Sequence, residues 1–186
     1  PPDTPLAQND KTPIKTDRYI AIARGGQQCT KLSPAEKVTQ NISTLEYPVV
    51  LLGDNNDHQR GEEIKNLLQK EDLFNTCGLY SLDQSASIIS QSLAVISNDT
   101  GLMHIAAALK KPIVSIWGNT IPDFGMYPYL PHNQALSILS EVNNLKCRPC
   151  SKLGYKKCPK KHFRCMMDQD ENFIARSVNR LINKSL

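Results

Sequence analysis

Short apolar runs and longer amphipathic stretches take turns along most of the chain. Six apolar, β-branched runs have the length of buried strands, at residues 18–23, 47–52, 73–77, 93–97, 112–117 and 135–139. Helical spacing of apolar residues fills the intervals, at residues 34–45, 57–70, 82–91, 99–111 and about 170–184. Because strands that alternate with helices pair in parallel through right-handed crossovers, the pattern predicts an α/β fold, a Rossmann-like three-layer sandwich with a parallel sheet.

Residues that cap helices stand where the predicted helices begin. Residues 33–36 (SPAE) offer a capping serine, a proline for the first turn and a capping-box glutamate, and residues 81–84 (SLDQ) repeat the capping-box pattern. Asp168 or Asp170 is expected to cap the closing helix. The apolar stripe of that helix predicts packing on the sheet and consists of Phe173, Ile174, Val178, Leu181 and Ile182.

The first 17 residues follow a different pattern. They hold four prolines among scattered polar residues and show no periodicity. This composition is typical of a linker or an extended arm. We therefore expect a domain over residues 18–186, and a chain that starts in a linker suggests that another segment precedes it.

Residues 93–118 read as strand, turn, helix and strand, and the turn carries candidate chemistry. A helix that starts at the carboxyl end of a parallel strand directs its free N–H groups into the crevice where such folds bind ligands. Gly101 lets an anion approach the backbone, Thr100 adds a hydroxyl, and His104 lies on the same helical face as Thr100. We expect Asn98 or Asp99 to cap this helix, with the Asp99 carboxylate engaged in capping bonds.

A purely structural role is the alternative for these residues. Asp-Thr-Gly is a common turn, and a histidine among apolar helical residues is often only a half-buried packing residue. The loops at 24–31, 53–57 and 78–81, however, emerge at the same sheet edge as this turn. Their convergence favours a site for an anionic ligand.

Charge and hydropathy narrow the classes of partner. The net charge of +4 suits an anionic ligand but is too small and too dispersed to indicate nucleic acid. No run approaches 18 apolar residues, and the first residues lack the apolar core of a signal peptide. These features predict a cytoplasmic protein with no transmembrane segment.

Four of the six cysteines crowd into one segment, residues 147–165, with the spacing C-x2-C-x7-C-x6-C: Cys147, Cys150, Cys158 and Cys165. Four such thiols can bind a structural zinc, although a zinc site usually shows two close pairs and here only the first two cysteines are close. Neighbouring lysines are expected to lower the pKa values of these thiols.

The string NDTGLMHIAAALKKPIVSIWG, followed by Thr120 and Pro122, resembles the donor-site signature of glycosyltransferase family nine, the bacterial lipopolysaccharide heptosyltransferases. The resemblance runs from about Tyr19 to the closing helix. It implies that the turn at Asp99, Thr100 and Gly101, together with His104, meets the diphosphate of a nucleotide-sugar.

The resemblance also implies roles for three residues in the other loops. Lys31 precedes a helix-starting Ser-Pro element, as a phosphate-contacting lysine does in the family, although Leu32 and Ser33 stand where a tryptophan is common. Asp57 falls where the family often has a glutamate that accepts hydrogen bonds from the ribose, and its alternative role is a helix cap. Tyr80 stands where the family's loop meets the base, and its ring either stacks on adenine or covers the helix end.

Family members have the GT-B fold, and this chain resembles the carboxyl-terminal, donor-binding half of it. The acceptor half and its acidic general base have no counterpart, so we expect no catalytic residue in this chain, which alone would bind nucleotide and transfer little. Similar cysteines occur near the carboxyl end of family members, which implies a thiol cluster that pins a long loop, with zinc binding as the alternative.

The implied reaction is inverting transfer of a sugar to a lipopolysaccharide core or another glycan acceptor, with ADP-heptose as the favoured donor. The inner membrane surface is an alternative location within the cytoplasm. Negative charge builds on the leaving diphosphate, and the helix amino end with Lys31 would stabilise it without a metal or other cofactor. Two other classes stay open because fold does not fix function: a non-catalytic nucleotide-binding module and a zinc-stabilised interaction domain.

Overall fold

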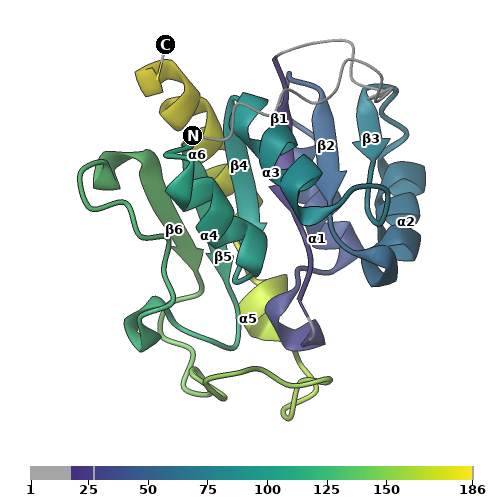
Figure 1. Cartoon of the computed structure of the whole chain (residues 1–186). Coiled ribbons are helices and arrows are strands. Elements are labelled where there is room, and N and C mark those ends of the chain that lie inside the picture. Colours follow the sequence, from purple (N-terminus) through teal and green to yellow (C-terminus); the bar gives the residue numbers. More distant parts are fainter. Residues whose placement is uncertain (1–17, 27, 186) are drawn as a thin grey trace.

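A computed structural model describes residues 18–26 and 28–185, so the predicted arm at 1–17 lies outside the described residues. Six parallel strands form one sheet in the order β3-β2-β1-β4-β5-β6 (Figure 1). The strands are β1 Ile20–Ala23, β2 Val49–Leu52, β3 Leu73–Asn75, β4 Ala94–Asn98, β5 Ile113–Trp117 and β6 Ser137–Glu141. The sheet confirms the predicted α/β, Rossmann-like architecture.

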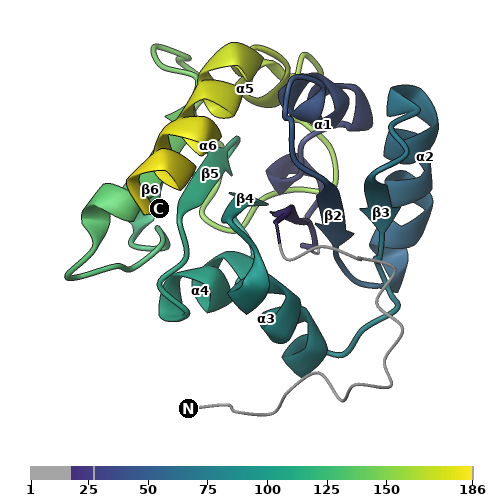
Figure 2. The same ribbon diagram turned by 90° about the horizontal axis from the view of Figure 1, so that it is seen from above.

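Helices cover both faces of the sheet and make it the middle of three layers. They are α1 Ala35–Ile42, α2 His58–Leu68, α3 Leu82–Gln91, α4 Gly101–Ala108, α5 Arg164–Met167 and α6 Glu171–Ser185. Viewed from above, α1, α2, α5 and α6 lie on one face, and α3 and α4 lie on the other (Figure 2). Short 3-10 helices stand in the connections, at η1 Cys29–Lys31, η2 Asn55–Asp57, η3 Pro122–Phe124 and η4 Gln134–Leu136.

Alternate residues of strands β1 to β5 supply two separate cores. Ile20 and Ile22 point into the cluster shared with α1, α2 and α6, whereas Ala21 and Ala23 point into the cluster shared with α3 and α4. Strands buried on both faces need continuous apolar sequence, which is why the strand runs of this chain show little alternation with polar residues.

The strand order places two connections side by side at the carboxyl edge of the sheet. The chain moves outward from β1 to β2 and β3, and then returns to place β4 on the other side of β1, with Ala23 opposite Ser97. The two loops start from adjacent strand ends. The loop after β1 leads to α1 on one face of the sheet, and the loop after β4 leads to α4 on the other face (Figure 2). Doubly wound sheets bind their ligands in the crevice at such a point.

Several predicted element boundaries were wrong, for local reasons. The third strand ends at Asn75 instead of Cys77, and the sixth begins two residues late because 134–136 form η4. The first helix ends at Ile42, and its expected capping box is not formed: Pro34 is the N-cap residue and makes no side-chain capping bond. The capping box between Ser81 and Gln84 is present, as predicted.

The closing helix largely matches its prediction. Asp170 caps it, because its Oδ1 accepts from the Phe173 backbone N–H at 2.9 Å, whereas Asp168 pairs with Arg164. Of the predicted apolar stripe, Phe173 is 38% exposed and the other four residues are buried. The short helix α5 inside the cysteine-rich segment was not predicted. Over the described residues, no helix is long and apolar enough to cross a membrane.

Candidate functional site

A cleft of about 510 Å³ opens at the carboxyl edge of the sheet, between the loops that follow β1, β2 and β4. Its lining comprises Arg24, Gly25, Gly26, Gly53, Asp54, Tyr80, Leu82, Ser85, Thr100, Gly101, Leu102 and Ile105. Three predicted site residues are therefore brought together here: Tyr80, Thr100 and Gly101. The other four predicted residues are outside this lining: Lys31, Asp57, Asp99 and His104.

The amino end of α4 is open toward the cleft. Thr100 is the N-cap residue, in an extended conformation, and makes no side-chain capping bond. A Cβ on Gly101 would meet no atom within 4 Å. The expectation that Asn98 or Asp99 caps this helix is wrong, because both side chains bind elsewhere. In the part of the chain that the structure describes, the first N–H groups of α4 thus lack a cap from the side chain of the N-cap residue, which suits an anionic ligand.

Asn98 and Asp99 instead attach the turn to neighbouring segments. The Asn98 amide donates to Ser33 Oγ at 3.0 Å and its oxygen accepts from the Ser33 N–H. Asp99 is 6% exposed, and its Oδ2 lies 2.7 Å from Lys31 Nζ and accepts from Thr120 Oγ1 at 3.0 Å. Lys31 is therefore brought to the predicted phosphate turn, with its charge paired to Asp99.

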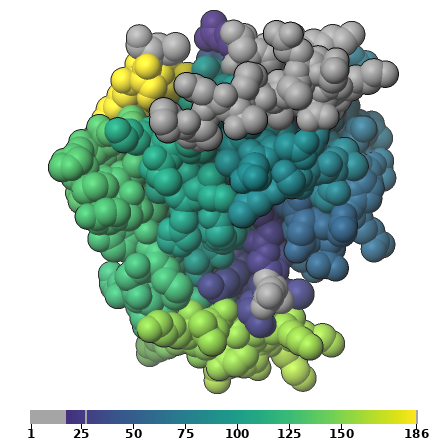
Figure 3. Space-filling view, in the orientation of Figure 1, coloured from purple at the N-terminus to yellow at the C-terminus, as the bar shows by residue number. Residues whose placement is uncertain are grey.

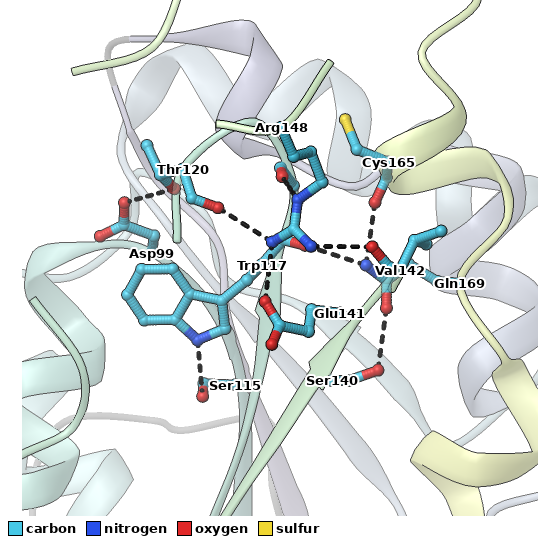
Figure 4. A network of polar contacts seen from close by, with 11 residues as sticks. Asp99, Ser115, Trp117, Thr120, Ser140, Glu141, Val142, Arg148, Cys165 and Gln169 are labelled. Carbon is cyan, nitrogen blue, oxygen red and sulfur yellow. Dashed lines mark hydrogen bonds and ion pairs between the residues drawn. The ribbon is translucent and has the colours of Figure 1, made fainter. Parts of the chain in front are cut away.

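A polar network extends from Asp99 into the carboxyl-terminal third of the chain (Figure 4). Arg148 donates to the carbonyl oxygens of Gly118, Thr120 and Val142 and pairs with Glu141 at 2.9 Å. Since Thr120 binds Asp99 directly, Arg148 fixes the loop after β5 against the turn that opens α4. Gln169 extends the network by donating to Trp117 O and Cys165 O.

Asp57 is the N-cap residue of α2, the position that one of its two predicted roles gave it, but its side chain makes no capping bond to α2. It is 4% exposed, and its Oδ2 accepts from the Asp54 N–H at 3.1 Å in the capping box of η2. Burial raises the pKa of Asp57 above its ordinary value, an effect that the hydrogen bond from Asp54 opposes. The carboxylate that lines the cleft beside Gly53 is Asp54, which the sequence reasoning did not single out.

Other residues of the site were also missed. Leu102 and Ile105 give α4 an apolar side toward the cleft, and their spacing of three was the signal for it. Arg24, at the end of β1, is fully buried, donates from Nη2 to Ser33 O at 3.3 Å, and has Asp57 as its main attractive charge. Its position in the sequence, directly after a buried strand and before Gly25, was the signal that a charged residue stands where this loop begins.

Tyr80 and His104 differ in their surroundings. Tyr80 is half-buried, lines the cleft and packs against the core shared with α3 and α4. Its position is compatible with both predicted roles, stacking on a base and covering the end of α3. His104 is exposed on α4, one turn after Thr100.

The cysteine-rich segment is attached to the domain mainly through groups other than thiols. Tyr155 and Thr30 are joined by three hydrogen bonds, and the Cys150 N–H donates to Asn119 O at 2.9 Å. Burial raises the pKa of Cys165 to about 11 and also raises that of Cys150, so the expected lowering by lysines was wrong for these two thiols. Within residues 18–26 and 28–185, no three His, Cys, Asp or Glu side chains are grouped as a metal site.

Comparisons with known proteins agree with this architecture. The family model for glycosyltransferase family 9 (heptosyltransferase) matches residues 3–160. Lipopolysaccharide heptosyltransferase 2 of Escherichia coli K12 is 43% identical over 81 residues, which cover 42% of this chain and 23% of that protein.

Solved structures extend the similarity to nearly the whole chain. The E. coli ADP-heptose lipopolysaccharide heptosyltransferase II has a TM-score of 0.74 and 26% identity, over 92% of this chain and 49% of that one. The E. coli heptosyltransferase WaaC with ADP has a TM-score of 0.62 and 17% identity, over 88% of this chain and 44% of that one, and so supports the fold alone. The chain thus spans about half the length of the solved relatives, and it belongs to glycosyltransferase family 9, the heptosyltransferases.

Proposed function

We propose that this chain is the donor-binding half of a GT-B heptosyltransferase and that its cleft holds a nucleoside diphosphate-sugar. The observation that carries the proposal is the uncapped amino end of α4, where Thr100 and Gly101 open into the cleft at the strand-order reversal. Family membership supports the reaction class, and the similarity to an ADP-heptose lipopolysaccharide heptosyltransferase supports ADP-heptose as the donor.

In this proposal the diphosphate lies at the amino end of α4 and the nucleoside extends along the cleft. Backbone N–H groups and the Thr100 hydroxyl bind the phosphate oxygens, and the side chain of Tyr80 stacks on the adenine. Asp54, at the edge of the cleft, accepts from the ribose hydroxyls in place of the more deeply buried Asp57. Leu102 and Ile105 provide the apolar wall beneath the nucleoside.

The chemical contribution of these residues is electrostatic. An acceptor hydroxyl attacks the anomeric carbon with inversion, the bond to the diphosphate breaks, and negative charge collects on the leaving phosphate. The partial positive charge of the α4 amino end stabilises this charge, with further contributions from Lys31 and His104. This arrangement requires no metal. The general base and the lipopolysaccharide-type acceptor belong to the other half of the enzyme.

Isothermal titration of this chain with ADP, UDP and GDP in metal-free buffer tests the proposal. We expect ADP to bind most tightly and Thr100→Val, which replaces the hydroxyl with a methyl group, to weaken ADP binding about fivefold to tenfold. Binding of all three nucleotides with equal affinity would contradict adenine recognition. A folded chain that binds none of them would contradict the donor site itself.

Gly101 allows a sharper comparison. A side chain at this position enters open space, so both Gly101→Ala and Gly101→Asp should fold. An aspartate in the first turn favours the α4 dipole but repels a diphosphate bound there. Gly101→Asp should therefore keep the melting temperature and lose ADP affinity at least tenfold, while Gly101→Ala keeps most of the affinity. Unchanged ADP binding by Gly101→Asp would exclude the α4 amino end as the phosphate site.

A further inference from the structure

A second cavity, of about 480 Å³, lies between η1, the start of α1, the first turns of α2 and the cysteine-rich segment. Its lining comprises Cys29, Thr30, Leu32, Pro34, Ala35, Glu36, Arg60, Glu63, Lys156, Lys157, Cys158, Lys161 and Phe163. It shares no lining residue with the donor cleft. The two hollows are therefore separate sites on the same domain.

The wall formed by the cysteine-rich segment is fixed in place. Thr30 donates to Tyr155 O at 2.9 Å and accepts from the Tyr155 N–H at 2.7 Å, which anchors the residue directly before Lys156. Gly154 adopts a left-handed conformation, and a Cβ there would lie 2.8 Å from Gln28 Cβ. Figure 3 shows this segment, in yellow-green, pressed against the purple atoms of the η1 region. Two lysines are thus held at a preformed cavity.

Positive charge dominates the rim of the cavity. Arg60, Lys156, Lys157 and Lys161 outnumber the two carboxylates of Glu36 and Glu63. In the described part of the chain, none of the four cations forms an ion pair with a carboxylate. The lysine and arginine charges are consequently available to an outside anion, and a concave wall strengthens their combined field.

The floor of the cavity adds two further features. Leu32, Ala35 and Phe163 make it partly apolar, so it can accept more than a bare ion. Pro34, the N-cap of α1, also lines the cavity and makes no side-chain capping bond, so within the described residues the N–H groups that open α1 lack a side-chain cap at this site. Lysines with backbone N–H groups are a typical set of phosphate-binding donors.

We propose that this cavity, which we name the basic cavity, is a second binding site on this domain, specific for a phosphate monoester. The monoester dianion matches the excess of cations, and its carbon portion contacts the apolar floor. The phosphate can come from a dissolved metabolite or from the head group of a membrane lipid. The proposal concerns a surface distinct from the donor cleft and does not depend on nucleotide binding there.

The test is titration of the whole chain with glycerol 1-phosphate, alongside sedimentation with vesicles of phosphatidic acid or of phosphatidylcholine alone. Lys156→Glu/Lys157→Glu reverses two charges on the rim. The matched control is Lys152→Glu/Lys160→Glu, because these exposed lysines belong to the same segment but do not line the cavity. Gly101→Asp serves as a control located in the donor cleft.

We expect the rim variant to lose affinity at least tenfold, with less than a threefold change in the segment control and in Gly101→Asp. Binding to glycerol 1-phosphate indicates a dissolved ligand, and binding to phosphatidic acid vesicles alone indicates a lipid; either supports the site when the rim variant removes it. Equal losses of affinity in the rim variant and in its control would show that the ligand responds only to the overall positive charge of the segment, which would also overturn the proposal. Loss in Gly101→Asp, or no binding in either arm, would overturn the proposal.

Discussion

At the scale of single residues, the ion pair between Lys31 and Asp99 organises the phosphate turn. Asp99 is nearly buried and has two partners, Lys31 at 2.7 Å and the Thr120 hydroxyl. Sequence could place these residues near one another only through the resemblance to a family, because a contact between positions 68 residues apart is tertiary. It could not reveal that the carboxylate binds a lysine instead of capping α4.

Replacing Lys31 should separate the contribution of this ion pair to folding stability from its contribution to ADP binding. Lys31→Met leaves the Asp99 carboxylate with one hydrogen bond, and should reduce the free energy of unfolding by about 1–3 kcal/mol, less than for a fully buried pair because Lys31 is 14% exposed. Lys31→Met/Asp99→Asn should recover most of that stability, since an amide can still accept from Thr120. Urea unfolding measures both.

ADP titration completes this comparison. The double variant should stay several-fold weaker than the original chain, because the lysine charge near the phosphates is missing. Full recovery of affinity together with stability would show that Lys31 only supports Asp99 and does not act on the ligand.

At the scale of elements, the types of helix and strand followed from apolar spacing, whereas their ends depended on contacts that spacing does not contain. Residues 33–36 have the composition of a capping box, yet the Ser33 hydroxyl accepts a hydrogen bond from the amide of Asn98, at the end of β4. Residues 81–84 form the box as predicted. The η4 turn moved the start of β6 by two residues for an equally local reason.

Packing of α6 on α1 offers an element-scale prediction with a defined pH dependence. Glu171 Oε2 lies 3.0 Å from Lys37 Nζ, and backbone and Lys37 hydrogen bonds lower the pKa of Glu171 below its ordinary value. A lowered carboxyl pKa stabilises the folded state above the unfolded value of 4.5, and this stabilisation is lost as pH falls through the folded value.

Glu171→Gln should therefore melt at a lower temperature than the original chain at pH 7. The difference corresponds to about 1 kcal/mol or less, because Glu171 is 40% exposed to solvent. The difference should shrink in melts recorded as the pH falls below 4.5. A difference that stayed constant from pH 7 to pH 3.5 would mean that the glutamate charge is not the cause.

Arg148 gives a second element-scale prediction, because it joins the loops after β5 and β6. Its guanidinium serves three carbonyl oxygens and Glu141, and Thr120 transmits the effect to Asp99. Arg148→Lys keeps one charge but cannot span these acceptors. We expect it to lower ADP affinity and melting temperature together, whereas Arg164→Lys, at an exposed pair, should change neither measurably.

At the scale of the whole molecule, sequence predicted the parallel three-layer class and the region of the donor turn. It did not predict the strand order, which brings the loops after β1 and β4 together, nor the cleft residues Asp54 and Arg24. Those follow from packing of the complete sheet. The sequence also did not predict the basic cavity, because its walls come from residues 29–36, 60–63 and 156–163, which meet only in the folded chain.

The central claim is that the diphosphate of the donor lies at the amino end of α4. Amide chemical-shift mapping of the isotope-labelled chain during titration with ADP tests it most directly. The account predicts the largest saturable shifts at Thr100, Gly101 and Leu102, with smaller ones at Gly25, Asp54 and Tyr80. Shifts confined to Lys156, Lys157 and the start of α1, with the α4 amides unmoved, would contradict it by placing the nucleotide in the basic cavity.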